Sequence, residues 1–130
     1  MPEPLNLNVP AQADAAAEVR AVLRRWLAGS MSDRELGDAQ LVVTELLSNS
    51  VRHAAIADGD PLYVRASAGR GVLHVEVEDG GSIGHVGRRP PDPETGGLGL
   101  NLVEALAIGW GVRRDASTTV WAELPFRQAG

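Results

Sequence analysis

The 130-residue sequence contains neither cysteine nor lysine. Without cysteine, the protein cannot form a disulfide, use a thiolate as a nucleophile or hold zinc through sulfur. Without lysine, it can contain neither a GxxxxGK[ST] phosphate loop nor the strand lysine of the common protein kinases. If the protein binds ATP, it must do so with a different architecture.

The sequence also lacks a signal-peptide pattern, an apolar run long enough to span a bilayer and an excess of positive charge. We therefore expect a cytoplasmic protein that does not contact a membrane. Its 12 arginines and 17 acidic residues give a net charge of -5. This charge argues against nucleic acid as a partner, because phosphates are neutralised by a basic surface.

Hydrophobic residues make up 44% of the chain and charged residues 22%. For this length, such a composition indicates one globular domain over residues 1–130. We expect disorder at about residues 1–4 and 127–130.

Hydrophobic periodicity predicts eight elements in the order β, α, α, β, β, α, β, β. The strands fall into antiparallel pairs and the helices can cover one face. The sequence therefore predicts an α+β two-layer sandwich, with a mixed, mostly antiparallel sheet covered on one face by three helices. The expected strands are 5–9, 62–67, 72–79, 110–113 and 118–124, and the first two helices are 11–27 and 32–57.

The most informative stretch is Val42–Ala54, within the second of these helices. Glu45, Asn49 and His53 recur every four residues, so they line one face of a helix. The apolar residues around them indicate a buried helix, in which polar groups need partners. A carboxylate and a carboxamide one turn apart suit a hydrated Mg²⁺, and Glu45 is a candidate general base. The alternative is a solvated polar face, which the apolar flanks disfavour.

The basic and aromatic residues have simpler interpretations. Arg20, Arg24 and Arg25 fall on the expected solvent side of the first helix, and docking a partner is a further hypothesis for Arg20. Trp110 and Trp121 are interpreted as core residues.

Asp79 ends the strand 72–79 with the same parity as its apolar residues. Its carboxylate should therefore point to the covered side of the sheet, where it can accept a hydrogen bond from an exocyclic amine. The alternative is that Asp79 and Gly80 only start a turn. The pattern by itself does not decide between the two.

A long polar loop, residues 82–95, leads into Gly96–Leu100 and the third helix. A structureless loop of this length in a small domain is usually functional or mobile. Glycines before a helix N-terminus can bind phosphate through free amides and the helix dipole. A tight turn into the helix is the alternative.

Four motifs, in this order, resemble the GHKL ATPase superfamily, whose ATP-binding fold is the Bergerat fold. The chain looks most similar to its small bacterial branch, the anti-sigma-factor serine-protein kinases. Glu45–Ala54 is similar to the N box of the family, and Asp79–Gly81 to its first glycine box. Gly97–Leu100 resembles the second glycine box and Thr118–Trp121 the closing threonine strand.

The resemblance implies a site for ATP and Mg²⁺. Asn49 would hold Mg²⁺ against the phosphates, and Glu45 would be the catalytic base. Asp79 would accept from the adenine amine, with Gly81 allowing close approach of the ring. Residues 82–95 would form the ATP lid. The other nucleotide contacts implied are Arg52, His53, Gly97, Leu98, Gly99, Leu100 and Thr119.

The resemblance also implies a serine-protein kinase that phosphorylates a STAS-type anti-anti-sigma protein, sequesters a sigma factor and thereby regulates transcription. A homodimer is expected, because dimers are usual among relatives and the N-terminal strand offers a free edge. Ile83 stands where the first glycine box usually has its second glycine. Two alternatives therefore stay open: a non-catalytic regulator that binds its partner with or without ATP, and a plain ATPase.

Overall fold

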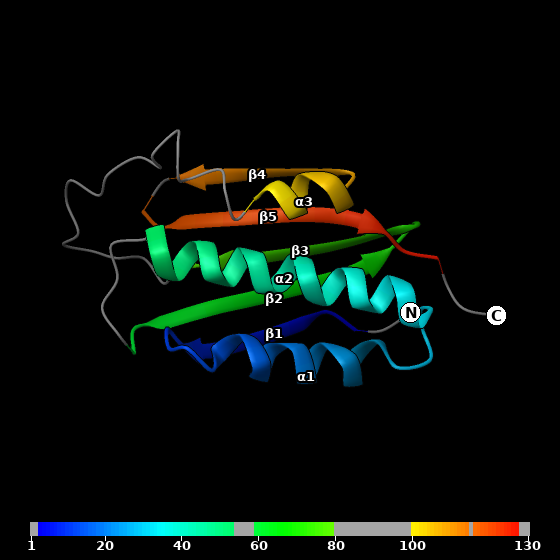
Figure 1. Ribbon diagram of the computed structural model, residues 1–130, viewed down its shortest axis with the longest axis horizontal. Coiled ribbons are helices and arrows are strands. Elements are labelled where there is room, and N and C mark those ends of the chain that lie inside the picture. Colours follow the sequence, from blue (N-terminus) through cyan, green and yellow to red (C-terminus); the bar gives the residue numbers. More distant parts are fainter. Residues whose placement is uncertain (1–2, 54–58, 80–99, 115, 128–130) are drawn as a thin grey trace.

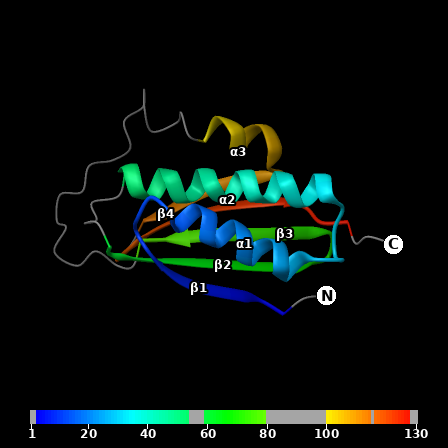
Figure 2. The ribbon, with the colours of Figure 1, turned by 60° about the horizontal axis from the view of Figure 1, so that its bottom comes forward.

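Three helices cover one face of a five-stranded sheet (Figures 1 and 2). The computed structural model describes residues 3–53, 59–79, 100–114 and 116–127. The strands are β1 (Leu5–Pro10), β2 (Pro61–Gly69), β3 (Val72–Glu78), β4 (Gly109–Arg114) and β5 (Thr118–Pro125). The helices are α1 (Ala15–Leu27), α2 (Asp33–His53) and α3 (Asn101–Leu106). The order of the elements along the chain is the predicted one.

The strands lie in the order β1-β2-β3-β5-β4, and each of these neighbours pairs antiparallel. We expected a mixed, mostly antiparallel sheet. All the described strands instead pair antiparallel. Between β2 and β3, Arg70 and Gly71 form a two-residue turn with positive φ at both positions (55° and 79°). This turn geometry matches the natural twist of a hairpin and fixes the register of the two central strands.

The core lies between the helices and the sheet, with α2 across the middle of the sheet (Figure 2). On β3, the alternating residues Leu73, Val75 and Val77 are fully buried. On α2, the buried apolar residues recur at helical spacing. They are Leu36, Ala39, Val42, Val43, Leu46 and Leu47. Burial of each large side chain contributes about 1.5–3 kcal/mol, so this layer sets the position of α2 over β3 and β5.

The start of α2 is fixed by Ser32 and Glu35. The Ser32 Oγ accepts a hydrogen bond from the backbone N–H of Glu35 at 3.2 Å and donates to Glu35 Oε1 at 3.1 Å. The pair satisfies one of the free amides of the first turn, as in a capping box.

We expected Arg20 on the exposed side of α1, but its side chain joins α1 to α2. Its Nη1 donates to Thr44 Oγ1 at 3.1 Å, and its backbone oxygen accepts from Gln40 Nε2 at 3.0 Å. The long arginine side chain reaches across the helix interface, which a helical wheel does not show. Arg24 and Arg25 are exposed, as predicted.

The expectation that Trp121 is a core residue is wrong. It alternates with the buried Val120 and Ala122, so its indole lies on the uncovered face of the sheet. There it stacks on His74, with ring centroids 5.9 Å apart, and covers Gly111, where an added Cβ would lie 2.9 Å from the ring. Trp110, in contrast, packs partly buried against the core.

Glu3 is linked to α1 by Trp26, whose Nε1 donates to the Glu3 backbone oxygen at 2.6 Å. Part of the segment 1–4, where we expected disorder, is therefore held by a hydrogen bond. None of the helices in the described residues has the length and hydrophobicity needed to cross a membrane.

Candidate functional site

The buried polar residues of the described chain gather at one end of the molecule, where α2 and β3 end and β5 begins (Figure 1). They are Asn49, Ser50, Asp79, Ser117 and Thr119. Burying polar groups is costly unless they are paired, so their concentration at one end of an apolar core marks a candidate site.

Asn49 lies on the core-facing side of α2. It follows Leu46 by three residues, so it continues the buried stripe of the helix, and it is only 8% exposed. Glu45, one turn earlier, is half-buried. An exposed polar face is therefore excluded for Asn49. Glu45 remains accessible at the edge of the same region.

Asp79 is held by a reciprocal pair of bonds to Thr118. Its N–H donates to the Thr118 oxygen at 3.1 Å, and its Oδ1 accepts from the Thr118 N–H at 3.2 Å. Asp79 is 3% exposed and continues the inward alternation of β3, as its parity predicts. A buried carboxylate at the end of a strand is well suited to accept a hydrogen bond from a ligand that enters this end of the sheet.

The two threonines of the closing strand lie on different sides. Thr119 pairs with Glu78, whose side chain lies on the uncovered face, whereas Thr118 is across from Asp79. Alternation along β5 therefore puts the Thr118 side chain on the side of Asp79. The family resemblance implied Thr119 as a nucleotide contact. The strand register instead favours Thr118 as the neighbour of Asp79.

Several predicted contacts lie outside the described residues: Gly81, Gly97, Leu98, Gly99 and the loop 82–95 with Ile83. Arg52 and His53 belong to the last turn of α2, but the structure does not describe their side chains. Leu100 is buried and precedes α3, and its oxygen accepts from the Glu104 N–H at 2.9 Å. The roles of these residues stay predictions.

The protein groups of the candidate site would fit Mg²⁺ only if other molecules supplied the remaining ligands. In the described part of the chain, no three His, Cys, Asp or Glu residues are placed to hold a metal ion. The amide oxygen of Asn49 is a suitable single ligand, and Mg²⁺ usually takes its remaining ligands from water and substrate phosphates. The residues present thus fit a metal that arrives with a nucleotide.

Glu76 is the centre of a charged network on the uncovered face. Its carboxylate lies 2.7 Å from Arg65 Nε, 3.3 Å from Arg113 Nη2 and 3.0 Å from His74 Nε2. The other ring nitrogen of His74 is 3.0 Å from Glu123 Oε2. Burial alone would raise the pKa of Glu76. The hydrogen bonds from His74, Arg65 and Arg113 outweigh burial and lower the pKa of this carboxyl from 4.5 to about 2.

Glu78 extends this network to the candidate site. Its Oε1 accepts from Arg65 Nη2 at 2.8 Å, and its Oε2 accepts from Ser117 Oγ at 2.5 Å. The bonds from Ser117 and Arg65 lower the pKa of Glu78 below its ordinary value. Sequence reasoning missed this pair, because no pattern links residues 39 positions apart on different strands.

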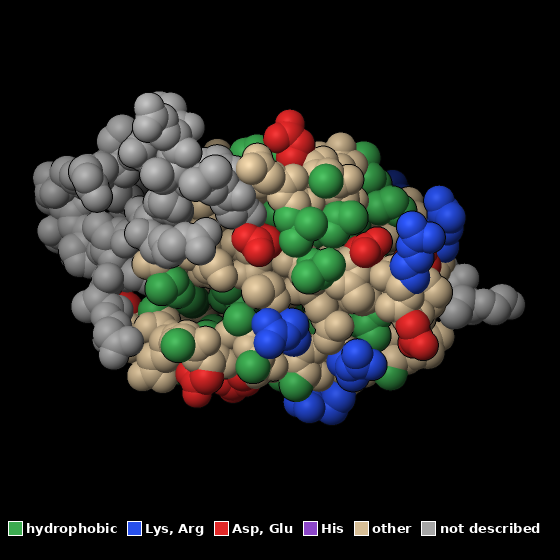
Figure 3. All heavy atoms as spheres, in the orientation of Figure 1, with side chains coloured by type: hydrophobic (Ala, Val, Ile, Leu, Met, Phe, Trp, Pro, Cys, Tyr) green, Lys and Arg blue, Asp and Glu red, His purple; other side chains and the backbone are tan. Residues whose placement is uncertain are grey.

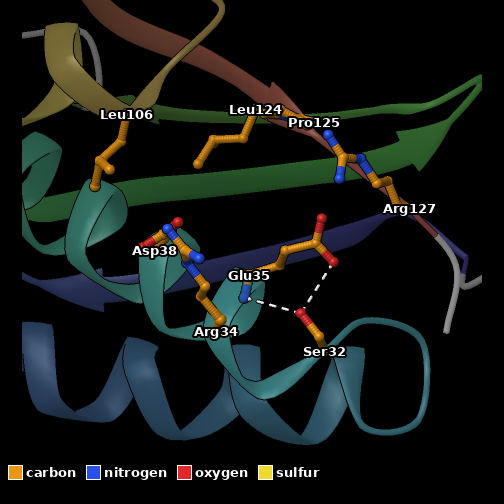
Figure 4. Close-up of a pocket in the computed structure, with 8 residues that line it drawn as sticks. All are labelled: Ser32, Arg34, Glu35, Asp38, Leu106, Leu124, Pro125 and Arg127. Atoms are coloured by element: carbon orange, nitrogen blue, oxygen red, sulfur yellow. Dashed lines mark hydrogen bonds between the residues drawn. The ribbon is translucent and has the colours of Figure 1, made fainter.

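A separate groove of about 430 Å³ lies at the opposite end of α2 (Figure 4). Leu106 and Leu124 point into it, and Arg34 and Asp38 lie side by side on α2. Figure 3 shows acidic and apolar side chains intermixed over the helical face, with arginines toward this end. The groove is remote from the buried polar cluster and is not part of the candidate site.

Comparison with known proteins agrees with this geometry. The family model for the histidine kinase-like ATPase domain matches residues 9–124, so the chain belongs to this family. No curated protein matches the chain. The fold is similar to a crystal structure of the RsbU and RsbW domains of Rv1364c from Mycobacterium tuberculosis, with a TM-score of 0.73 and 27% sequence identity. The similarity covers 98% of this chain and 33% of that chain.

The family recognised from the four motifs is therefore confirmed, and so is the α+β sandwich. The neighbour contains an RsbW domain, which supports the resemblance of this chain to the anti-sigma branch of the superfamily. Because the present chain corresponds to about one third of that neighbour, the activity and partners of the whole neighbour are not transferred with the fold.

Proposed function

We propose that the protein is an ATP-binding anti-sigma factor. It would phosphorylate a serine on a STAS-type anti-anti-sigma antagonist and sequester a sigma factor. The observation that carries the proposal is the buried polar cluster where α2 and β3 end, within a histidine kinase-like ATPase domain. A sigma-factor partner would place the protein in the cytoplasm.

We assign the main functions of such a site to three of the described residues. Asp79, buried and oriented by Thr118, would accept from the amine of adenine. Asn49 would complete the ligands of a Mg²⁺ ion that arrives with the phosphates. We include Thr118 beside Thr119 as a candidate nucleotide contact, because the strand register puts it on the side of Asp79.

Glu45 is the candidate base for phosphate transfer. It is half-buried on α2, one turn before Asn49, and so lies close to the proposed metal ligand. Its carboxylate would take the proton of the acceptor serine as the serine oxygen attacks the γ-phosphorus, and ADP would leave.

Calorimetric titration with Mg-ATP tests the site. The wild type should bind, and Asn49→Ala should lose most of the affinity because the metal loses its protein ligand. Asn6→Ala, at an exposed position of β1, is the matched control and should bind like the wild type. If Asn49→Ala and the wild type bind equally, the proposed site is wrong.

Phosphotransfer separates the kinase from its non-catalytic alternative. Glu45→Gln should bind Mg-ATP normally but transfer no phosphate to a STAS-type antagonist. The alternative is a regulator of the same fold that binds its partner without transfer, favoured by Ile83 in the first glycine box. That regulator would show no transfer even in the wild type, and Glu45→Gln would leave partner binding unchanged.

A homodimer remains part of the proposal. β1 lies at one edge of the sheet, so its outer backbone groups are available for pairing. Sedimentation at several protein concentrations, with and without Mg-ATP, measures the oligomeric state.

A further inference from the structure

On the uncovered face of the sheet, two hydrogen bonds to Glu78 tie β2 and the turn before β5 to the end of β3, directly beside the candidate site. Arg65 on β2 holds one oxygen of Glu78, and Ser117 holds the other. Glu78 immediately precedes Asp79, and Ser117 immediately precedes Thr118. The tie therefore joins the two chain segments whose next residues form the Asp79–Thr118 pair.

The position of Ser117 is not set by the β-ladder. β5 begins at Thr118, so Ser117 belongs to the turn that follows β4. Its hydroxyl bond to Glu78 adds a side-chain link between this turn and β3, and Ser117 is 8% exposed. Because the Thr118 N–H donates to Asp79 Oδ1, a displacement of the turn that carried Thr118 with it would also move this carboxylate.

We propose that Glu78 and Ser117 are positioning residues for base recognition. Through the backbone of Thr118, they hold the Asp79 carboxylate in the orientation that reads the exocyclic amine of adenine. The inference rests on the proposed function, because it assigns a role in the same nucleotide site. Neither residue touches the nucleotide itself.

The selectivity of the site measures this role better than its affinity. ADP carries the exocyclic amine and IDP carries an oxygen at that position, so the ratio of their dissociation constants reports on Asp79. Loss of one well-placed hydrogen bond corresponds to a factor of roughly three to ten. A merely structural defect would weaken both nucleotides equally and leave the ratio unchanged.

The experiment is calorimetric titration of the full chain with Mg-ADP and Mg-IDP. Ser117→Ala and Glu78→Gln should weaken ADP by roughly three- to tenfold, leave IDP nearly unchanged and so reduce the selectivity ratio. Ser117→Thr, which keeps the hydroxyl, should restore the ratio. Glu123→Gln is the matched control, because it lies on the same face but at the other end of the network.

The outcomes distinguish the two levels of the proposal. If the wild type binds neither nucleotide, the proposed function fails and this inference with it. If the wild type prefers ADP and the two variants keep that preference, or lose both nucleotides equally, the positioning role is overturned and the function stands. If the wild type binds ADP and IDP equally, Asp79 does not read the amine and the inference is likewise overturned. Urea unfolding of each variant confirms that the titrated protein is folded.

Discussion

Replacing Glu76 by glutamine tests the electrostatics of the uncovered sheet face. The carboxylate is 12% exposed and receives bonds from His74, Arg65 and Arg113. Its pKa is about 2 in the folded protein against 4.5 for the ordinary group. The folded state therefore binds a proton at Glu76 less readily than the unfolded state.

The sign and size of the effect follow from this difference. Stability from the lowered pKa is fully present above pH 4.5 and is lost as the pH falls toward 2. A difference of this size corresponds to about 3 kcal/mol at most, at 1.36 kcal/mol for each pH unit. Arg65 and Arg113 are 36% and 53% exposed, so solvent screens them and we expect a net contribution of about 1–2 kcal/mol.

The assay is urea unfolding of the wild type and Glu76→Gln at pH 7 and near pH 2.5. At pH 7 the variant should be less stable by about 1–2 kcal/mol, and the difference should shrink at the lower pH, where the native carboxylate is close to its own pKa. Glu104→Gln, at an exposed position of α3, is the control for the removal of one acidic charge. A gap between wild type and Glu76→Gln that stays constant with pH would refute the reasoning.

Three other substitutions test a close packing contact, a helix cap and a hydrogen bond between two helices. Gly111→Ala should destabilise the protein by about 1–3 kcal/mol, because the new Cβ meets the Trp121 ring at 2.9 Å; in a Trp121→Ala background the penalty, measured by urea unfolding, should vanish. Ser32→Ala should cost about 0.5–2 kcal/mol through loss of the cap, whereas Ser32→Asp should keep most of the stability. Arg20→Met should lower the stability by about 0.5–1.5 kcal/mol through its bond to Thr44, and Thr44→Val should add little in the Arg20→Met background if that bond is the cause.

Patterns that repeat along one element were predictable from the sequence. The alternation of β3 predicted both its buried face and the inward direction of Asp79, because strand parity continues past the last paired residue. The apolar residues around Glu45 and Asn49 likewise predicted a buried helix; Asn49 is buried, whereas Glu45 is half-buried.

Features that depend on the pairing of distant strands were not predictable in this way. Trp121 is an exception: its outward position follows from alternation along β5, in which Val120 and Ala122 point inward, so this local signal was missed. The motif located the closing strand, and the register across from β3 then puts Thr118, not Thr119, beside Asp79. The tie from Glu78 to Ser117 has no local signal at all, because it forms only when the sheet is assembled.

The pairing of β3 with β5 also determines at which stage of folding the candidate site can form. These strands are neighbours in space, but α3 and β4 lie between them in the chain. Asp79 cannot acquire its partner Thr118 until this long-range pairing has formed, and such pairings are slow because they close a long loop first. A nucleotide that reads Asp79 would therefore bind the completed sheet and not an early intermediate. Its stabilising effect, which grows with ligand concentration, would then report on folding of the whole chain.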